Sequence, residues 1–215
     1  MLRRLFPLLL LVVACAGAQA QTPHTHEHRF SGAEGWARVF DDPARDRWQR
    51  PDEVVAALAL APDAAVADIG AGTGYFAARL ARAVPKGRVY AVDIEPDMVR
   101  YLGERAQRED LSNLRPVLGK PDDPQLPEPV DRVLIVDTYH HIGDRIGYFE
   151  RLRARLKPGG AVAIVDFTLD SPVGPPRSAR IPAQQVRDEM QRAGYALAAQ
   201  HDFLPHQYFL VFRPR

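Results

Sequence analysis

The sequence predicts an α/β fold with a doubly wound, mostly parallel β-sheet that is covered by helices on both faces. Short, almost wholly apolar runs alternate along the chain with segments whose apolar residues recur at helical spacing. A strand without a polar face is buried on both sides, which is typical of a parallel sheet between two helical layers. Residues 195–212 depart from this alternation and hold two strand-like runs around Leu204-Pro205-His206. They predict an antiparallel pair that closes the sheet.

The composition limits the protein to one ordinary globular domain. The chain has 215 residues, of which 46% are hydrophobic and 26% charged, and its formal net charge is +1. That length is sufficient for a complete hydrophobic core. No basic run interleaves with aromatic residues as a nucleic-acid groove requires, so we expect no nucleic-acid partner. The sequence gives no basis for predicting an oligomeric state.

The first 20 residues have the layout of a secretory signal peptide. Arg3 and Arg4 precede an apolar run over residues 5–13, and small residues then lead to an A-x-A cleavage pattern at residues 18–20. The apolar run is too short for a comfortable membrane span. We therefore expect cleavage after Ala20 and export to the periplasm. Two alternatives are lipidation of Cys15 in the lipoprotein-like box "VVAC", which would tether the protein to a membrane, and an uncleaved anchor.

Residues 21–35 form a polar segment with His24, His26 and His28. Alternate histidines can bind a transition metal, but this segment shows no rigid second shell, so a solvated linker is the better interpretation and no metal site is expected. Cys15 is the only cysteine. A chain cleaved after Ala20 therefore lacks disulfides, a cysteine nucleophile and thiolate metal ligands. The folded domain is expected over residues 36–215.

The individual elements follow from local pattern and turn signals. Proline and acidic residues at the start of 51–60, and the apolar spacing in 75–84, predict helices. The run "AVADI" between turn residues predicts a buried strand over 65–69. By the same criteria the remaining elements are strands at 87–94, 114–118, 130–137 and 161–167, and helices at 96–109 and 144–156.

Three glycines follow the first predicted strand. Gly70, Gly72 and Gly74 lie where the carboxyl end of that strand meets the next helix, so a ligand there can approach the main chain. A dinucleotide-binding fingerprint needs its third glycine one residue later, where this chain has Tyr75. Asp68 precedes the glycines and would repel a phosphate but attract a cationic amino group. The spacing therefore argues against a nicotinamide-dependent oxidoreductase.

Acidic residues follow the next two strands. Asp93 ends the second strand at the distance expected of a ribose-binding carboxylate. Asp122 and Asp123 come after the third strand, where a carboxylate can accept a hydrogen bond from an adenine amino group. The alternative for each of these acids is a structural role in capping a turn. At Asp122 this alternative is nearly as strong as the ligand-binding interpretation.

Together these motifs resemble the class I S-adenosylmethionine-dependent methyltransferases. "VADIGAGTGYF" is similar to the first motif of that family, "AVDIEPDM" to its ribose segment and "PDDPQLP" to its adenine segment. "DRVLIVDTYHHI" and "LKPGGAVAIVDF" resemble its fourth and fifth strands. The resemblance covers about residues 36–215 and implies a Rossmann-like sheet of seven strands with an antiparallel C-terminal strand.

The resemblance also implies a set of cofactor-binding residues for S-adenosylmethionine. The three glycines would line its methionine part, and Asp68 would bind its amino group. Asp93 would hold the ribose hydroxyls, and Ile94 would pack on the adenine face. Asp122 is the preferred partner of the adenine amino group, with Asp123 as the close second.

Candidate catalytic residues gather after the fourth strand. Methyl transfer from a sulfonium mainly requires positioning, and a base helps only when the acceptor arrives protonated. His140, His141 and Asp137 are the candidates, with a structural role for the histidines as an equally strong alternative. The proline-rich loop 170–182, which carries Arg177 and Arg180, is a candidate substrate lid, and residues 40–51 are a candidate cover for the cofactor.

The sequence thus predicts an S-adenosylmethionine-dependent methyltransferase acting on a small-molecule acceptor whose identity it does not reveal. The alternative is a non-catalytic module that binds an adenosine-like ligand and keeps the fold. An export signal raises the question of how a cofactor made in the cytosol reaches the enzyme.

Overall fold

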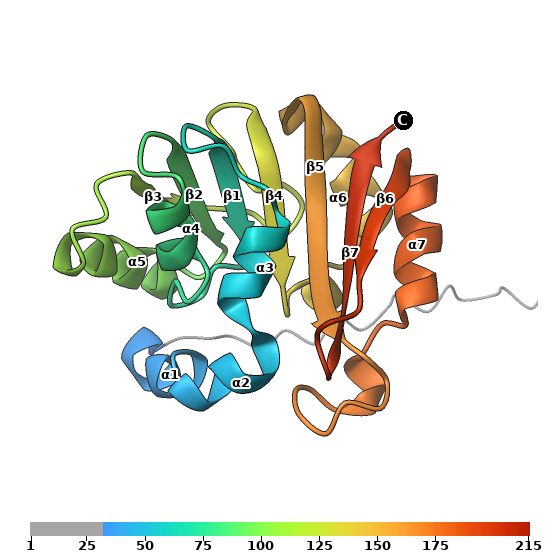
Figure 1. Ribbon diagram of the computed structural model, residues 1–215, viewed down its shortest axis with the longest axis horizontal. Helices are drawn as coiled ribbons and strands as arrows, with labels where there is room; N and C mark the ends of the chain where they lie inside the picture. Colours follow the sequence, from blue (N-terminus) through green and yellow to red (C-terminus); the bar gives the residue numbers. More distant parts are fainter. Residues whose placement is uncertain (1–31) are drawn as a thin grey trace, which may run out of the picture.

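The computed structural model describes residues 32–215 (Figure 1). The predicted signal peptide, Cys15 and the histidines of the predicted linker lie outside the described residues. The described chain begins with helix α1 (Ala33–Phe40), which starts three residues before Trp36, the predicted start of the domain. Within residues 32–215, no helix is both long and apolar enough to cross a membrane.

A single mixed sheet forms the centre of the molecule. Its seven strands lie in the order β3-β2-β1-β4-β5-β7-β6. The strands are β1 (Ala65–Ile69), β2 (Arg88–Asp93), β3 (Leu114–Leu118), β4 (Val130–Val136), β5 (Leu156–Phe167), β6 (Tyr195–His201) and β7 (Gln207–Pro214). Strand β7 pairs antiparallel with both neighbours, whereas β1 to β5 pair in parallel. The predicted Rossmann-like architecture is confirmed, including the antiparallel closing strand.

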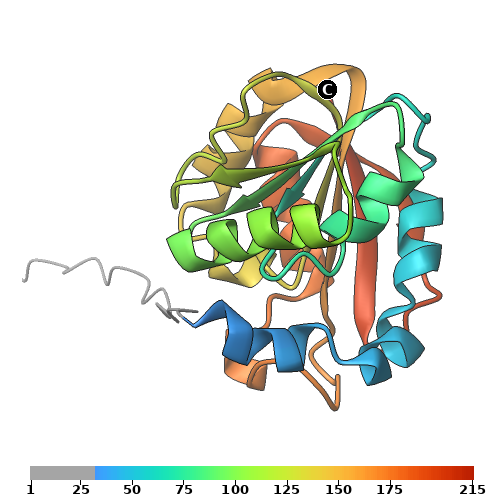
Figure 2. The ribbon, with the colours of Figure 1, turned by 90° about the vertical axis from the view of Figure 1, so that its left-hand side faces the viewer.

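Helices cover both faces of this sheet, as Figure 2 shows in the view toward the β3 edge. One face carries α3 (Pro51–Ala57), α4 (Ala77–Ala83) and α5 (Pro96–Arg108), and the other carries α6 (Arg145–Leu152) and α7 (Ala183–Arg192). Residues of β1 alternate between the two hydrophobic cores, with Val66 in one and Ala65, Ala67 and Ile69 in the other. Burial on both faces explains why this strand is apolar at nearly every position.

Helix α7, like α1, is an element that the sequence analysis missed. It begins directly after Pro182, has no side-chain cap, and buries only Val186 and Met190. Two apolar residues in ten give a weak helical period, and the burial that stabilises this helix comes from its contact with β6 and α6. Tertiary packing therefore stabilises this helix, and the local sequence pattern does not predict it.

The N-terminal helices lie at the carboxyl ends of the parallel strands. Figure 1 shows α1 and α2 (Asp46–Gln49) at the end of the sheet where β5 finishes, with the loop after β5 at the same end. The backbone N–H groups of Gly32 and Ala33 donate to Asp97 of α5, at 2.7 and 3.3 Å. Ligands of doubly wound sheets bind at this end of the sheet, beside the point where the strand order reverses between β1 and β4.

Candidate functional site

The glycine loop connects β1 to α4 at that reversal point. Gly70, Gly72 and Gly74 all have positive φ angles, of 74°, 54° and 92°. A Cβ atom on Gly70 would lie 2.2 Å from Oγ1 of Thr138, and one on Gly74 would lie 2.8 Å from Cδ2 of Leu102. The protein's own packing therefore requires glycine at positions 70 and 74.

Gly72 differs from its two neighbours in the loop. A Cβ atom there would meet only the ring of Phe40, at the ordinary contact distance of 3.4 Å. The packing of the described residues thus accommodates a Cβ atom at Gly72. Its main chain is accessible to a ligand, while its N–H donates to Asp93 Oδ2 at 2.8 Å.

Asp68 is buried at the carboxyl end of β1, with only 2% of its surface exposed. Its Oδ2 atom has no hydrogen-bond partner among the described residues. Burial, with the nearby charge of Asp93, raises the pKa of Asp68 to about 7, against the opposing charge of Arg45. An unpaired buried carboxylate oxygen costs free energy unless a donor or a cation approaches it.

Asp93 ends the neighbouring strand β2 and braces the glycine loop. Besides the N–H of Gly72 it accepts a hydrogen bond from the N–H of Glu95, at 3.0 Å. Burial raises the pKa of Asp93, although these two bonds oppose the shift. A carboxylate has about four acceptor positions, so two remain for ligand hydroxyl groups.

Two large apolar side chains are exposed beside Asp93. Ile94 is 54% exposed, and Leu118, which pairs with Asp93 across the β2–β3 ladder, is 52% exposed. The backbone N–H of Gly119 donates to the carbonyl oxygen of Asp93 at 2.9 Å, so the loop after β3 starts at the same place. An apolar ring can pack on these side chains with a gain from burial.

The two acids of the loop after β3 differ in their contacts. Asp123 caps a turn, because its Oδ1 accepts from the N–H of Gln125 at 2.7 Å. Asp122 is exposed, and its backbone carbonyl accepts from Arg151 Nε at 3.0 Å. The carboxylate of Asp122 is thus the more accessible of the two.

The paired histidines lie beyond β4 in a short 3₁₀ turn. Nδ1 of His140 lies 2.9 Å from Oδ2 of Asp166, and the two side chains are 5% and 1% exposed. Burial disfavours the charged imidazolium, but the hydrogen bond and charge of Asp166 outweigh it, so the pKa of His140 is raised above its usual value. The ring of His141 packs against that of His140, with the centroids 4.1 Å apart and the planes tilted by 41°. Asp166 therefore orients His140 and leaves Nε2 as the ring nitrogen for other contacts.

Asp137, the third candidate catalytic residue, is held by three donors. Its Oδ2 accepts from Arg45 at 3.1 Å and from Gln49 at 3.0 Å, and its Oδ1 accepts from Gln207. Burial raises the pKa of Asp137 to about 6, against the opposing charge of Arg45. Its φ of 54° is unusual for a residue other than glycine. This carboxylate ties the N-terminal segment to the ends of β4 and β7.

Residues 40–51 supply contacts that no sequence motif indicated. Trp48 packs beside Phe167 and His206, with ring centroids 5.9 and 6.3 Å apart. Gln49 is fully buried, and its Nε2 also donates to Gln207 at 3.1 Å. These side chains meet residues more than a hundred positions away, so only the fold brings them together.

The loop 170–182 is organised by one arginine. The guanidinium of Arg180 donates to five backbone carbonyls, which belong to Thr168, Leu169, Ser171, Val173 and Pro175. The hydrogen bonds of this guanidinium thus stabilise the conformation of the loop.

The second arginine of this loop also has local partners. Arg177 pairs with Asp170 and donates to the carbonyl of Leu169. Both arginines of the predicted lid are thus engaged within the loop and its immediate neighbours.

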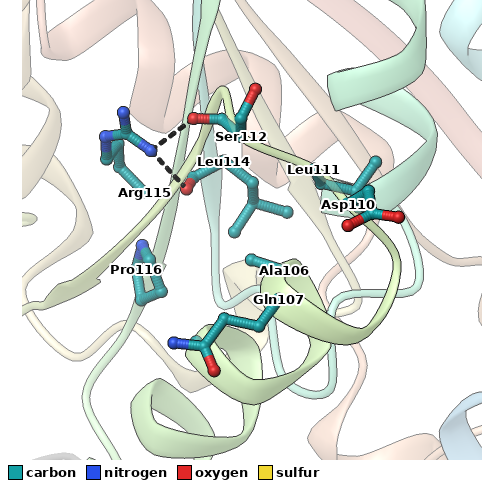
Figure 3. Close-up of a pocket in the computed structure, with 9 residues that line it drawn as sticks. Ala106, Gln107, Asp110, Leu111, Ser112, Leu114, Arg115 and Pro116 are labelled. Carbon is teal, nitrogen blue, oxygen red and sulfur yellow. Dashed lines mark hydrogen bonds between the residues drawn. The ribbon is translucent and has the colours of Figure 1, made fainter.

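A pocket of about 540 Å³ lies away from all of these residues, between α5 and the edge strand β3. Figure 3 shows Leu114, Pro116 and Ala106 lining it, together with Arg115, which donates to two backbone carbonyls. None of the predicted site residues lines this pocket. Within residues 32–215, no group of three metal-ligating side chains is placed to hold a metal ion.

The comparisons with known proteins agree with this arrangement. A family model described as a methyltransferase domain matches residues 66–160. The 27-O-demethylrifamycin SV methyltransferase of Amycolatopsis mediterranei is 31% identical over 140 residues, which are 64% of this chain and 50% of that protein. The chain spans about half the length of the curated relatives it matches.

Two solved structures show the same fold. A SAM dependent methyltransferase from Aquifex aeolicus has a TM-score of 0.77 and 24% identity, over 83% of this chain and 96% of its own. Magnesium protoporphyrin IX methyltransferase from Synechocystis PCC 6803, with bound SAH, has a TM-score of 0.67 and 20% identity, over 86% and 95% of the two chains. The family match includes the glycine loop, Asp93 and both histidines, and the described chain has the fold of these S-adenosylmethionine-dependent methyltransferases.

Proposed function

We propose that this protein transfers a methyl group from S-adenosylmethionine to a small-molecule acceptor. The observation that carries the proposal is the unpaired Oδ2 of buried Asp68, in the same strand-to-loop segment as Gly72, where a Cβ atom would contact only the Phe40 ring. This pair of features fits a ligand with a cationic amino group that approaches the main chain closely. The match to the methyltransferase-domain family supports the same cofactor.

The residues around the loop fit the other parts of that cofactor. Asp93 keeps two acceptor positions for ribose hydroxyl groups. Ile94 and Leu118 offer exposed apolar surface for the adenine ring, and the exposed carboxylate of Asp122 is our choice for its amino group. When bound, S-adenosylmethionine supplies an electrophilic methyl group on a sulfonium sulfur.

His140 is our proposed general base. Its Nδ1 faces Asp166, which fixes the ring and stabilises the imidazolium that forms when Nε2 accepts a proton from the acceptor. Asp137 accepts hydrogen bonds from Arg45, Gln49 and Gln207, so we assign it a role in positioning these three side chains. We make no such assignment for His141, whose ring packs against that of His140 at a tilt of 41°.

Small molecules are the acceptor class that the relatives support. The names of two similar proteins refer to 27-O-demethylrifamycin SV and to magnesium protoporphyrin IX, both of them small molecules. The particular acceptor of this protein is left to experiment.

Calorimetry with the purified protein tests the cofactor. We expect S-adenosylmethionine and S-adenosylhomocysteine to bind and NAD to show no heat of binding, because the loop lacks the dinucleotide spacing. Transfer of a labelled methyl group into a small-molecule extract of the host then tests turnover. Binding without any transfer would favour the non-catalytic module, and binding of NAD instead would reject the proposal.

Changes at His140 should alter the pH dependence of turnover. His140→Ala should lower kcat by about 10²–10⁴ for a hydroxyl acceptor, the usual contribution of a general base. In the wild type, activity should rise with pH through a pKa above 6.5, because only the neutral imidazole accepts a proton and Asp166 raises that pKa. Asp166→Asn should move this rise to lower pH. The assignment is wrong if His140→Ala keeps both the rate and the pH profile, or if only His141→Ala changes them.

The location of the protein also remains a proposal. We propose that residues 1–20 are a signal peptide, that 21–35 are a linker and that residues 36–215 act in the periplasm, supported by the A-x-A pattern and the early apolar run. Intact mass spectrometry of protein from its native host should find a chain that starts at Gln21. A lipidated chain that starts at Cys15 would contradict this cleavage site, and a chain that keeps Met1 would favour an anchored, cytosol-facing enzyme.

A further inference from the structure

Helix α7 contacts the turn that carries His140 through the side chain of Glu189. The hydroxyl of Tyr139, the residue directly before His140, donates to Oε2 of Glu189 at 2.6 Å. Tyr139 is fully buried and Glu189 is 14% exposed, so the bond is shielded from most of the competing solvent. It joins the first residue of the 3₁₀ turn to a helix residue that lies 50 positions later in the chain.

Arg145 of α6 fixes the other end of the same turn. Its Nε and Nη2 atoms donate to the two oxygens of Glu189, at 2.7 and 3.0 Å, in the fork geometry of a strong arginine–carboxylate pair. Its Nη1 donates to the backbone carbonyl of Ile142, the residue that ends the turn, at 3.1 Å. Glu189 therefore holds both ends of the turn, directly at Tyr139 and through Arg145 at Ile142.

The carboxyl group of Glu189 is ionised at neutral pH. Burial favours a raised pKa, but the hydrogen bonds from Arg145 and Tyr139 outweigh it, so the pKa of Glu189 lies below its usual value. Gln185, one turn earlier in α7, also donates to Oε1 at 2.8 Å. The negative charge of this carboxylate therefore balances the positive charge of Arg145.

This balance matters because Arg145 is among the charged groups that act on His140. Burial lowers the pKa of His140, and so does the charge of Arg145. Asp166 at the end of β5 and Asp137 after β4 raise that pKa and prevail. His141 packs against the His140 ring from within the turn. An Arg145 without its counter-charge should therefore lower the pKa of His140.

We propose that Glu189 is a positioning residue for His140, on which it acts through Tyr139 and Arg145. The inference rests on the proposed role of His140 as the general base. The predicted lid, residues 170–182, leads directly into α7, so the same carboxylate also connects the lid to the base. Substitutions of Glu189 should change the rate and its pH dependence, while the glycine loop keeps its affinity for the cofactor.

Glu189→Gln tests the charge, because it keeps the size of the side chain and an acceptor for Tyr139. NMR titration of the His140 ring in the ligand-free protein, assigned with His140→Ala, is the first measurement. The pKa of His140 should fall by about 0.5 pH unit or more, because a nearby uncompensated charge acts through an effective dielectric constant well below that of water. The rise of kcat with pH should move down by the same amount, and calorimetry should find the wild-type affinity for S-adenosylhomocysteine.

Glu189→Ala tests the positioning, because it removes the contacts with Tyr139 and Arg145 together. We expect kcat to fall by about tenfold to a hundredfold at every pH, since a displaced base no longer lies in reach of the acceptor. Glu189→Gln should retain more of the wild-type rate, because it keeps the bond to Tyr139. Equal rates for the two variants would contradict this step.

Asp188→Asn is the matched control. Asp188 is the preceding residue of the same helix, is exposed, and accepts from Gln184 at 2.9 Å. This variant should keep the His140 titration and the rate of the wild type. A Glu189→Gln variant with the wild-type titration and pH profile would overturn the inference. A shifted titration, in a series where His140→Ala keeps the wild-type rate, would instead reject His140 as the base and retain the contact.

Discussion

Asp68→Asn should make the ligand-free protein more stable and should remove most of its affinity for S-adenosylhomocysteine. The pKa of Asp68 is raised from 3.8 to about 7, so the folded state holds this proton more tightly than the unfolded state does. The free energy of unfolding therefore falls as the pH rises from about 4 to about 7, and the penalty stays constant above pH 7. Asparagine does not ionise and avoids this penalty.

The expected gain is smaller than the full pKa shift implies. A shift of about three pKa units corresponds to about 4 kcal/mol, and the new amide N–H groups lose part of it if they find no acceptor. We expect a net gain of about 1–3 kcal/mol at pH 8 and none at pH 4, measured by urea unfolding at both pH values. At the same time, the affinity for S-adenosylhomocysteine should fall at least about tenfold, because the ammonium loses its counter-charge.

Proton release gives an independent check of the same residue. Below pH 7 the free wild-type protein holds a proton on Asp68, and an incoming ammonium group favours the ionised form. Calorimetry at pH 6 in buffers of different ionisation enthalpy should detect release of up to one proton on binding, and none for Asp68→Asn. A variant that is less stable at pH 8 and binds as the wild type does would show that Asp68 serves the fold.

The sheet was predictable because its signals are local. Strands 65–69 and 114–118 were predicted with the bounds that the structure has, since each is a short run between clear turn residues. Helix α7 and the contacts of residues 40–51 were not predictable, because their stability comes from partners far along the chain.

The sequence predicted which residues lie at the site, but it did not predict the role of each residue. The three glycines look alike in the sequence. In the structure, a Cβ atom on Gly70 would clash with Thr138 and one on Gly74 would clash with Leu102, whereas one on Gly72 would clash with neither. Asp137 was predicted as a catalytic candidate from its place after a strand. Its donors Arg45 and Gln49 precede it by 92 and 88 residues, so no local pattern could show that its carboxylate is engaged.

Gly72→Val should abolish the binding of S-adenosylhomocysteine while the protein stays folded. The valine Cβ meets only the Phe40 ring, at 3.4 Å, so its branched side chain occupies the space that we assign to the ligand. The φ of 54° costs a residue with a side chain about 1–2 kcal/mol, which a domain of this size tolerates. Calorimetry should detect no binding, and the thermal unfolding temperature should fall by a few degrees.

Gly159→Val distinguishes the effect of backbone strain from the effect of filling the proposed ligand position. Gly159 lies in the first part of β5 with a φ of 77°, and nothing lies within 4 Å of the Cβ that it lacks. Its replacement therefore carries a similar backbone penalty far from the glycine loop. This control should lower the unfolding temperature comparably and keep the affinity of the wild type. If Gly72→Val binds as tightly as Gly159→Val does, the position beside Gly72 does not hold the cofactor, and the loop serves only the geometry of the strand-to-helix turn.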